Sequence, residues 1–212
     1  DYLYIKNILE SSMDIVRLSD HVHSDSSINN HKLALGEFVK GEFTKAKNIL
    51  QKDYYKDKYN IYIASLMSDI LWADGEKNKA RDILKDILEI YPNNNAITFQ
   101  LLKYNIKDSI MLDQSVKKLS IAMSNNYNNP RAYKLLAEGY EKIQDKYNAK
   151  LALVNFYNIK GNMPMAFRVI DDGLTSDELN NIQKTNLENM RKSILCDRNP
   201  PLEPIFGDKT CD

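Results

Sequence analysis

Two stretches of the chain share one order of polar and hydrophobic positions. The first reads KGEFTKAKNIL around Gly41, and the second reads DGEKNKARDIL around Gly75. Each contains a glycine, an alanine five positions later and then an Ile-Leu pair, and the spacing of the two glycines is 75 − 41 = 34. Such a pattern predicts a structural unit that recurs with a period of about 34 residues.

Each shared position has a mechanical reason to recur in a pair of antiparallel helices. The glycine suits the tight turn between the two helices, where a positive φ costs little only for glycine. Ala46 and Ala80 suit the closest approach of the helices, where a larger side chain would force them apart. Pro92 follows the second copy and stops its helix. The period and these roles are those of the tetratricopeptide repeat.

A further copy begins at Pro130, and Gly161 with Ala166 repeats the glycine–alanine spacing. The interval from Pro92 to Pro130 is longer, since 130 − 92 = 38, so we expect a short insertion near positions 107–112. The copy at Pro130 has motif residues at Tyr133, Leu136, Ala137, Tyr140, Ala149 and Leu153.

These units predict an all-α protein, a tetratricopeptide-type solenoid of helical hairpins with a C-terminal capping helix. We place the solenoid at residues 28–195, one helix and a polar loop at 1–27, and an irregular, Pro-rich tail at 196–212. Thr175, with Glu178 three positions later, predicts the capping box that begins the capping helix. The missing initial Met indicates a processed protein or an excised fragment.

The first helix of each repeat is expected to line a groove. Counting from Gly41 places Ile28, His31, Leu35, Phe38 and Val39 in this groove, and counting from Gly75 places Tyr62, Ser65, Asp69, Trp72 and Ala73 there. Most of these side chains are apolar or aromatic. The unit at Pro130 adds a charged wall of Arg131, Lys134, Glu138, Glu141 and Lys142. An apolar surface beside a charged rim is typical of a site for a polypeptide. Phe38 and Trp72 at helical spacing are also typical of core or cap residues, and the charged wall of a solvated face.

Composition narrows the function further. Lys plus Arg and Asp plus Glu both number 29, so the formal net charge is zero, and we expect no nucleic-acid partner. No apolar run reaches the roughly 20 residues of a transmembrane helix. No catalytic motif, metal site or cofactor is expected, since His21, His23 and His31 form no zinc-binding helix. Cys196 and Cys211 are as consistent with free thiols as with a disulfide.

The stretch from Tyr62 to Ser193 resembles the C-terminal repeats of BepA-like bacterial zinc metalloproteases, peptidase family M-forty-eight. The resemblance rests on Leu112-Asp113-Gln114, Asn129-Pro130, Tyr133, Leu135-Leu136-Ala137, Tyr140, Asp145, Ala149, Leu151-Ala152-Leu153, Phe156-Tyr157, Gly161 and Ala166. It implies a periplasmic repeat domain that presents substrates or partners to a protease domain. This chain lacks the HExxH motif, so the resemblance assigns it no catalytic residue.

Our leading hypothesis is a protein-interaction domain of such a periplasmic protease involved in outer-membrane protein quality control. One alternative is a metalloprotease whose catalytic part lies outside this chain. Another is a self-associating scaffold, in which the tail or the N-terminal helix docks into a neighbour.

Overall fold

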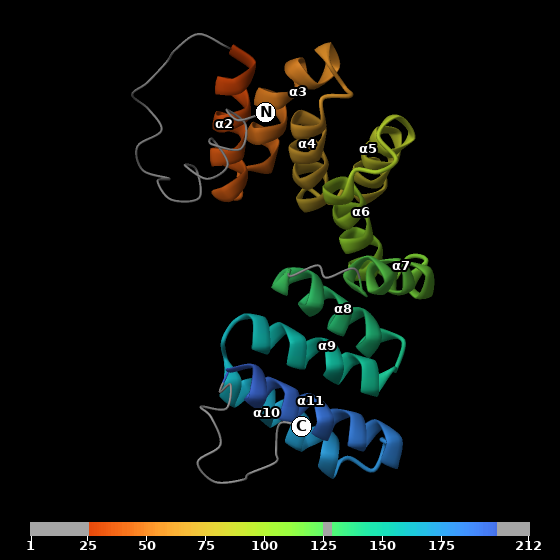
Figure 1. The fold of residues 1–212 in the computed structure, drawn as a ribbon. Coiled ribbons are helices and arrows are strands. Elements are labelled where there is room, and N and C mark those ends of the chain that lie inside the picture. The colour runs from red at the N-terminus through yellow and green to blue at the C-terminus, as the bar shows by residue number, and fades with distance from the viewer. Residues whose placement is uncertain (1–25, 125–128, 199–212) are drawn as a thin grey trace. The chain divides into compact units, whose positions relative to one another are not determined.

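The computed structural model describes residues 26–124 and 129–198, and these residues form helices joined by short connections (Figure 1). The all-α fold class is therefore confirmed. The helices are α2 (Ser26–Val39), α3 (Phe43–Lys56), α4 (Ile61–Ala73), α5 (Lys77–Ile90), α6 (Asn95–Asp108), α7 (Leu112–Ser124), α8 (Pro130–Lys142), α9 (Lys146–Ile159), α10 (Met163–Thr175) and α11 (Asn181–Arg198).

Within the described residues, five of the helix–helix turns share one backbone geometry. After each helix one residue has a positive φ, and the next N–H donates to a carbonyl five positions back, as Glu42 does to Glu37 over 2.9 Å. This is the Schellman motif, which satisfies the last carbonyls of a helix. The positive-φ residues are Gly41 (84°), Gly75 (89°), Ser109 (59°), Gln144 (61°) and Gly161 (73°).

The turns give the true period of the chain. From Gly75 to Ser109 the spacing is again 109 − 75 = 34, and from Ser109 to Gln144 it is 144 − 109 = 35. The added residue is Met111, which lies in the α6–α7 turn with a φ of 45°. The expected insertion near positions 107–112 is therefore present, and it is a single residue.

The interval of 38 residues from Pro92 to Pro130 is longer than the repeat because these two prolines do not occupy equivalent positions. Asn60, Asn94 and Asn129 each accept a hydrogen bond from a backbone N–H at the start of the following helix, and their spacings repeat those of the turns. Pro130 is the first residue of α8, whereas Pro92 precedes the capping residue Asn94 by two positions. The asparagine caps, not the prolines, mark equivalent helix starts.

Small side chains lie where paired helices approach most closely. Ala46, Ala80 and Ala149 are fully buried, and the Ser68 hydroxyl donates to the Ala80 carbonyl over 2.9 Å. The facing positions on the first helices are Ala34, Ser68 and Ala137, but α6 has Leu102 there. Among the described helices, α2–α3, α4–α5 and α8–α9 are closely packed pairs.

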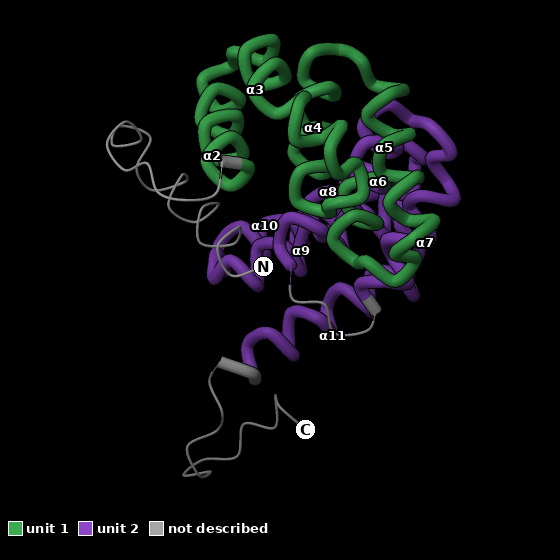
Figure 2. The backbone as a smooth tube through the Cα atoms, turned by 90° about the horizontal axis from the view of Figure 1, so that it is seen from above, with its two compact units in different colours: residues 1–101 green, residues 102–212 purple. Residues whose placement is uncertain are grey.

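The chain divides within α6 into two compact units, residues 1–101 and 102–212 (Figure 2). In unit 1 the core includes Leu50, Ile70, Leu84 and Ile87, all fully buried. In unit 2, one core cluster joins α9, α10 and α11 through Val154, Ala166, Ile170, Leu179, Leu187 and Ile194.

The capping helix α11 begins later than predicted. Thr175 is the last residue of α10, and its hydroxyl donates to the Asp171 carbonyl at 3.0 Å. The reciprocal pair lies at Asn180 and Gln183 instead: Gln183 N–H donates to the Asn180 side chain at 2.9 Å, and Asn180 N–H donates to Gln183 at 3.0 Å. The prediction at Thr175 and Glu178 was wrong because buried Leu179 is needed in the core before the helix starts.

The predicted end segments lie largely outside the described residues. Of residues 1–27 only Ser26 and Ser27 are described, and they belong to α2. In the predicted tail, residues 196–198 end α11; Cys196 is disulfide-bonded, and Cys211 lies outside the described residues. No helix in the described part of the chain has the length and hydropathy of a bilayer span.

Candidate partner-binding surface

The predicted groove residues of α2 and α4 occupy matching positions in two repeats. Each α4 residue follows its α2 counterpart by the same interval that separates the turns at Gly41 and Gly75. The two helices also contact each other. We call this face of unit 1 the first-helix surface; it comprises Leu35, Phe38, Val39, Tyr62, Asp69, Trp72 and Ala73.

Exposure varies along the first-helix surface. Val39 is 51% exposed and Ala73 is exposed, whereas Leu35, Tyr62 and Asp69 are half-buried. An exposed aliphatic side chain among half-buried apolar neighbours provides area that a partner could cover.

His31 was expected in the groove, and this expectation was wrong. Its side chain is only 2% exposed, and it forms a hydrogen bond with the backbone of Tyr62. Burial lowers the pKa of His31 because the imidazolium loses its hydration, and the Tyr62 backbone offsets part of this shift. The residue therefore packs α2 against α4.

Ser65, the residue equivalent to His31 on α4, is also used in packing. Its hydroxyl donates to the Gln100 side chain at 2.8 Å, and the Gln100 amide donates back to the Ser65 carbonyl at 3.0 Å. This pair ties α4 to the first turns of α6. His31 therefore joins α2 to α4, and Ser65, at the equivalent position, joins α4 to α6.

Phe38 and Trp72 close the turns of their own hairpins. The Phe38 ring lies 5.8 Å from that of Phe43, the first residue of α3. Trp72 holds the equivalent place, with the Lys77 ammonium 5.0 Å from its ring centre and the Arg81 guanidinium 5.6 Å away. Both rings are half-buried, so they support the turn and present only part of their surface to solvent.

The charged wall on α8 divides into two groups. Arg131 and Lys134 are exposed. Glu138 pairs with Lys107, and Glu141 pairs with Lys146 at 3.1 Å across the α8–α9 turn. Lys142 donates to the carbonyls of Ile106 and Lys107, both at 2.7 Å, at the C-terminal end of α6, where a cation is favoured.

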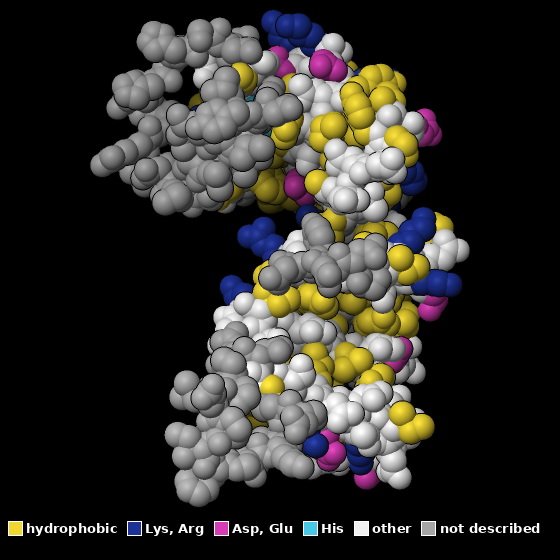
Figure 3. Space-filling model, viewed as in Figure 1, with side chains coloured by type: hydrophobic (Ala, Val, Ile, Leu, Met, Phe, Trp, Pro, Cys, Tyr) yellow, Lys and Arg dark blue, Asp and Glu magenta, His cyan; other side chains and the backbone are white. Residues whose placement is uncertain are grey.

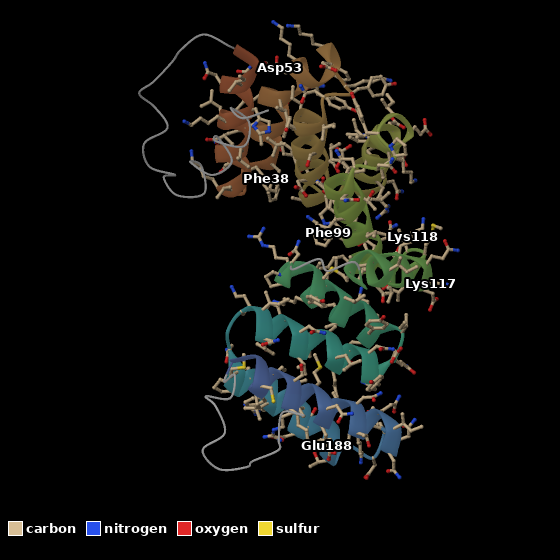
Figure 4. The ribbon with its side chains drawn as sticks, viewed as in Figure 1. Phe38, Asp53, Phe99, Lys117, Lys118 and Glu188 are labelled. Atoms are coloured by element: carbon tan, nitrogen blue, oxygen red, sulfur yellow. The ribbon has the colours of Figure 1, made fainter. Side chains whose placement is uncertain are left out.

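Helix α6 has two residues of unit 1 at equivalent positions that the sequence reasoning missed. Counting one repeat onward from Tyr62 and Ser65 gives Ala96 and Phe99. Phe99 is half-buried and falls at the position of His31 and Ser65; Figure 4 labels it together with Phe38. The equal spacing from Gly75 to Ser109 could have revealed these two positions, but a serine replaces the expected turn glycine.

A second feature is a pair of cavities, each lined by one first helix and the two second helices beside it. One, of 420 Å³, lies between α3, α4 and α5, and we call it the α3–α5 cavity. The other, of 210 Å³, lies between α7, α8 and α9, and we call it the α7–α9 cavity. Moving two repeats along the chain, by 34 + 35 = 69, superposes these lining positions: Gln51/Ser120, Tyr54/Met123, Met67/Leu136, Leu71/Tyr140, Lys79/Asn148 and Ile83/Ala152.

The α3–α5 cavity has a charged edge. Glu76 pairs with both Lys47 and Lys79, and these two ammonium groups hold its pKa down to about 2. Tyr54 lies beside them, and burial together with the charge of Asp86 raises the pKa of its hydroxyl. Hydrophobic side chains gather on the face of unit 1 seen in Figure 3. Exposed apolar or aromatic residues lie at the ends of α3 and α5: Tyr55, Tyr59, Ile90 and Tyr91.

The described part of the chain contains no group of three or more His, Cys, Asp or Glu side chains that could hold a metal ion.

The turn geometry, the repeat period and the small residues at helix contacts define a tetratricopeptide-like protein of helical hairpins. No family model matches the chain, and neither does any curated protein. Solved structures similar to it include "MamA MSR-1 C2", with 17% identity, a TM-score of 0.49 and coverage of 81% of this chain and 97% of that one. Another is a mutant of MamA, with 16% identity, a TM-score of 0.48 and coverage of 76% and 95%.

Proposed function

We propose that this chain is a protein-interaction module that binds a polypeptide partner on the first-helix surface of unit 1. The observation that supports this most is the apolar strip on α2 and α4, which repeats from one helix to the next and ends in solvent at Val39. Asp69 lies within the strip and could orient a bound backbone or a basic side chain. Repeat solenoids commonly use such extended surfaces for binding.

Val39 is the best residue for a test because its side chain is exposed at the C-terminal end of α2. Phe38 and Trp72 are less suitable, since their contacts with Phe43 and Lys77 stabilise the fold. The chain also provides a matched control in Leu33, which is apolar, 47% exposed and on α2, but outside the first-helix surface.

The experiment places a photoreactive benzophenone side chain at position 39 or at position 33 of the full chain. Purified protein is irradiated with extract from its source cells, and cross-linked proteins are identified by mass spectrometry. We expect one defined partner to cross-link from position 39 and not from position 33. Equal labelling from both positions would overturn the proposal.

We further propose the context that the resemblance implies, a repeat domain that serves a zinc metalloprotease in the periplasm. The supporting motifs fall at structurally meaningful places: Asn129-Pro130 caps and starts α8, and Ala149 and Ala166 are buried at helix contacts. Reading the gene upstream of Asp1 tests this proposal, because an HExxH-coding segment is expected there.

A further inference from the structure

The α3–α5 cavity combines an apolar interior with a charged edge. Met67 and Leu71 from α4 and Ile83 from α5 are buried and form its apolar side. At its edge, Lys47 and Lys79 share the single carboxylate of Glu76, so two positive charges face one negative charge and one positive charge is in excess. The edge therefore favours an anionic group.

The mouth of the cavity has the character of a protein-binding surface. Tyr55 is 73% exposed, and its ring centre lies 5.8 Å from that of half-buried Tyr54. Tyrosine rings provide apolar faces together with a polar hydroxyl, a combination enriched at interfaces. The volume of 420 Å³ falls within the range of about 300–1,000 Å³ that is common for ligand sites.

We propose that the α3–α5 cavity is a docking site for an acidic segment of a protein partner: a large apolar side chain enters the cavity, and a neighbouring carboxylate pairs with Lys79. This inference rests on the proposed function in taking the partner to be a protein, but it concerns a different face of unit 1. Lys79 is the pairing group because its side chain is 73% exposed, whereas that of Lys47 is only 31% exposed.

The α7–α9 cavity supplies an internal comparison. It has asparagine at position 148, where the α3–α5 cavity has Lys79, and none of its lining residues is charged. It also has half the volume. A change in the charge of a bound peptide should therefore alter its affinity for the α3–α5 cavity and leave its affinity for the α7–α9 cavity unchanged.

The probes are three blocked peptides, acetyl-Gly-Phe-Glu-Gly-amide and its Gln and Lys analogues. Each is titrated into the ¹⁵N-labelled full chain, and amide shifts are followed by NMR. We expect the Glu peptide to shift the amides of Gln51, Tyr55 and Lys79. Its affinity should exceed that of the Gln peptide by about two- to five-fold, the range for an exposed ion pair, and the Lys peptide should bind most weakly. Shifts at Ser120 and Asn148 should not depend on peptide charge.

A matched pair of variants isolates the ion pair. Lys79→Gln should lower the affinity for the Glu peptide to that for the Gln peptide. Lys85→Gln is the control, because Lys85 lies on the same helix, forms the same kind of i,i+3 pair with Asp82 and does not line the cavity. Both lysines are exposed, so the variants are expected to fold, which circular dichroism checks.

Three results would overturn the inference: no shift at the cavity amides, equal affinity for the three peptides, or an equal effect of Lys79→Gln and Lys85→Gln. Cross-linking from position 39 separates this failure from failure of the proposed function. A partner captured there without peptide binding at the cavity leaves the first-helix surface intact and removes only the acidic docking site.

Discussion

The α3–α5 and α7–α9 cavities occupy equivalent places in the repeat, but their side chains differ in a regular way. At Met67/Leu136 both cavities have an apolar residue that is buried against neighbouring helices. At Lys79/Asn148 and Gln51/Ser120, where side chains reach the edge, charge and size change. The packing position at Met67/Leu136 therefore stays apolar, whereas the two positions that meet solvent change their charge and size.

The two units also differ in how they make the same turn. Unit 1 uses glycine at positions 41 and 75, where the left-handed backbone costs little. Unit 2 uses Ser109 and Gln144 at the equivalent points, with the same hydrogen bonds, and has a glycine in the later turn at Gly161. The turn is therefore required by the hairpin geometry, and glycine is the easier of two solutions.

The largest predicted effect tests whether the units are energetically separate. Leu84→Ala in unit 1 and Leu187→Ala in unit 2 each remove a fully buried side chain, and each should cost about 2–5 kcal/mol of unfolding free energy. Trp72, the single tryptophan, reports on unit 1. In urea titrations we expect Leu84→Ala to lower the Trp72 fluorescence midpoint, and Leu187→Ala to lower only the midpoint of the far-ultraviolet circular dichroism signal.

The reason is that repeat units interact mainly with their nearest neighbours, and the chain forms two compact units, residues 1–101 and 102–212. If Leu187→Ala lowers the fluorescence midpoint as much as Leu84→Ala does, the chain unfolds as one cooperative body and the distinction between the units fails.

A smaller effect is expected from Gly173→Ala in unit 2. A Cβ at this position would lie 2.4 Å from the Leu187 Cδ1 atom, where α10 packs against α11. The overpacking should cost about 1–3 kcal/mol, measured by urea unfolding. Combining it with Leu187→Ala should cost less than the sum of the two variants, because the shortened side chain makes room for the methyl group. An additive cycle would contradict this contact.

Exchanging the turn residues should move the stability of the two units in opposite directions. Gly75→Ala places a side chain at a φ of 89° and should destabilise unit 1 by about 1 kcal/mol, although no atom lies within 4 Å of the new Cβ. Gln144→Gly relieves the same strain in unit 2 and should stabilise it by up to about 1 kcal/mol. Thermal unfolding of both variants measures the shifts, and shifts of the same sign would contradict the strain argument.

Much of this architecture was predictable from sequence because the turn and packing positions impose recognisable residues. Gly41, Gly75, Ala46 and Ala80 gave the period, and the structure places all four as predicted. Ser109 and Gln144 were not found, because a non-glycine residue at positive φ leaves no compositional signal. The capping box was misplaced because Thr175 and Glu178 have the right spacing, whereas the choice between two candidate caps depends on burying Leu179.

The binding surfaces were predicted less completely. The rows on α2 and α4 followed from the glycine spacing, and their assignment to a groove stays a prediction. Sequence alone could not show that Lys142 caps α6 or that Glu76 pairs with Lys47, since these contacts link positions far apart in the chain. Neither could it show the two cavities, whose equivalence depends on the one-residue insertion at Met111.

The stability of the two units should also differ in its dependence on pH, because a buried histidine is present only in unit 1. Residues 102–212 contain no histidine, whereas His31 in unit 1 is buried and its pKa lies below the usual value of 6.5. As the pH falls through 6.5, the unfolded chain takes up a proton at His31 before the folded chain does. The folded state therefore loses stability below pH 6.5, and the loss continues down to the folded pKa.

We expect the urea midpoint from Trp72 fluorescence to fall between about pH 7 and about pH 5.5, and His31→Gln to reduce that fall. The carboxylates whose pKa is lowered, Glu37, Glu76 and Asp172, act in another window: their stabilisation is present above the unfolded pKa near 4 and is lost only below it. They therefore stay ionised throughout the measurement. A pH dependence that persists unchanged in His31→Gln would show that the contact between α2 and the Tyr62 backbone is not its source. A dependence confined to the wild type would make unit 1 the pH-sensitive half of a chain whose repeats are otherwise built alike.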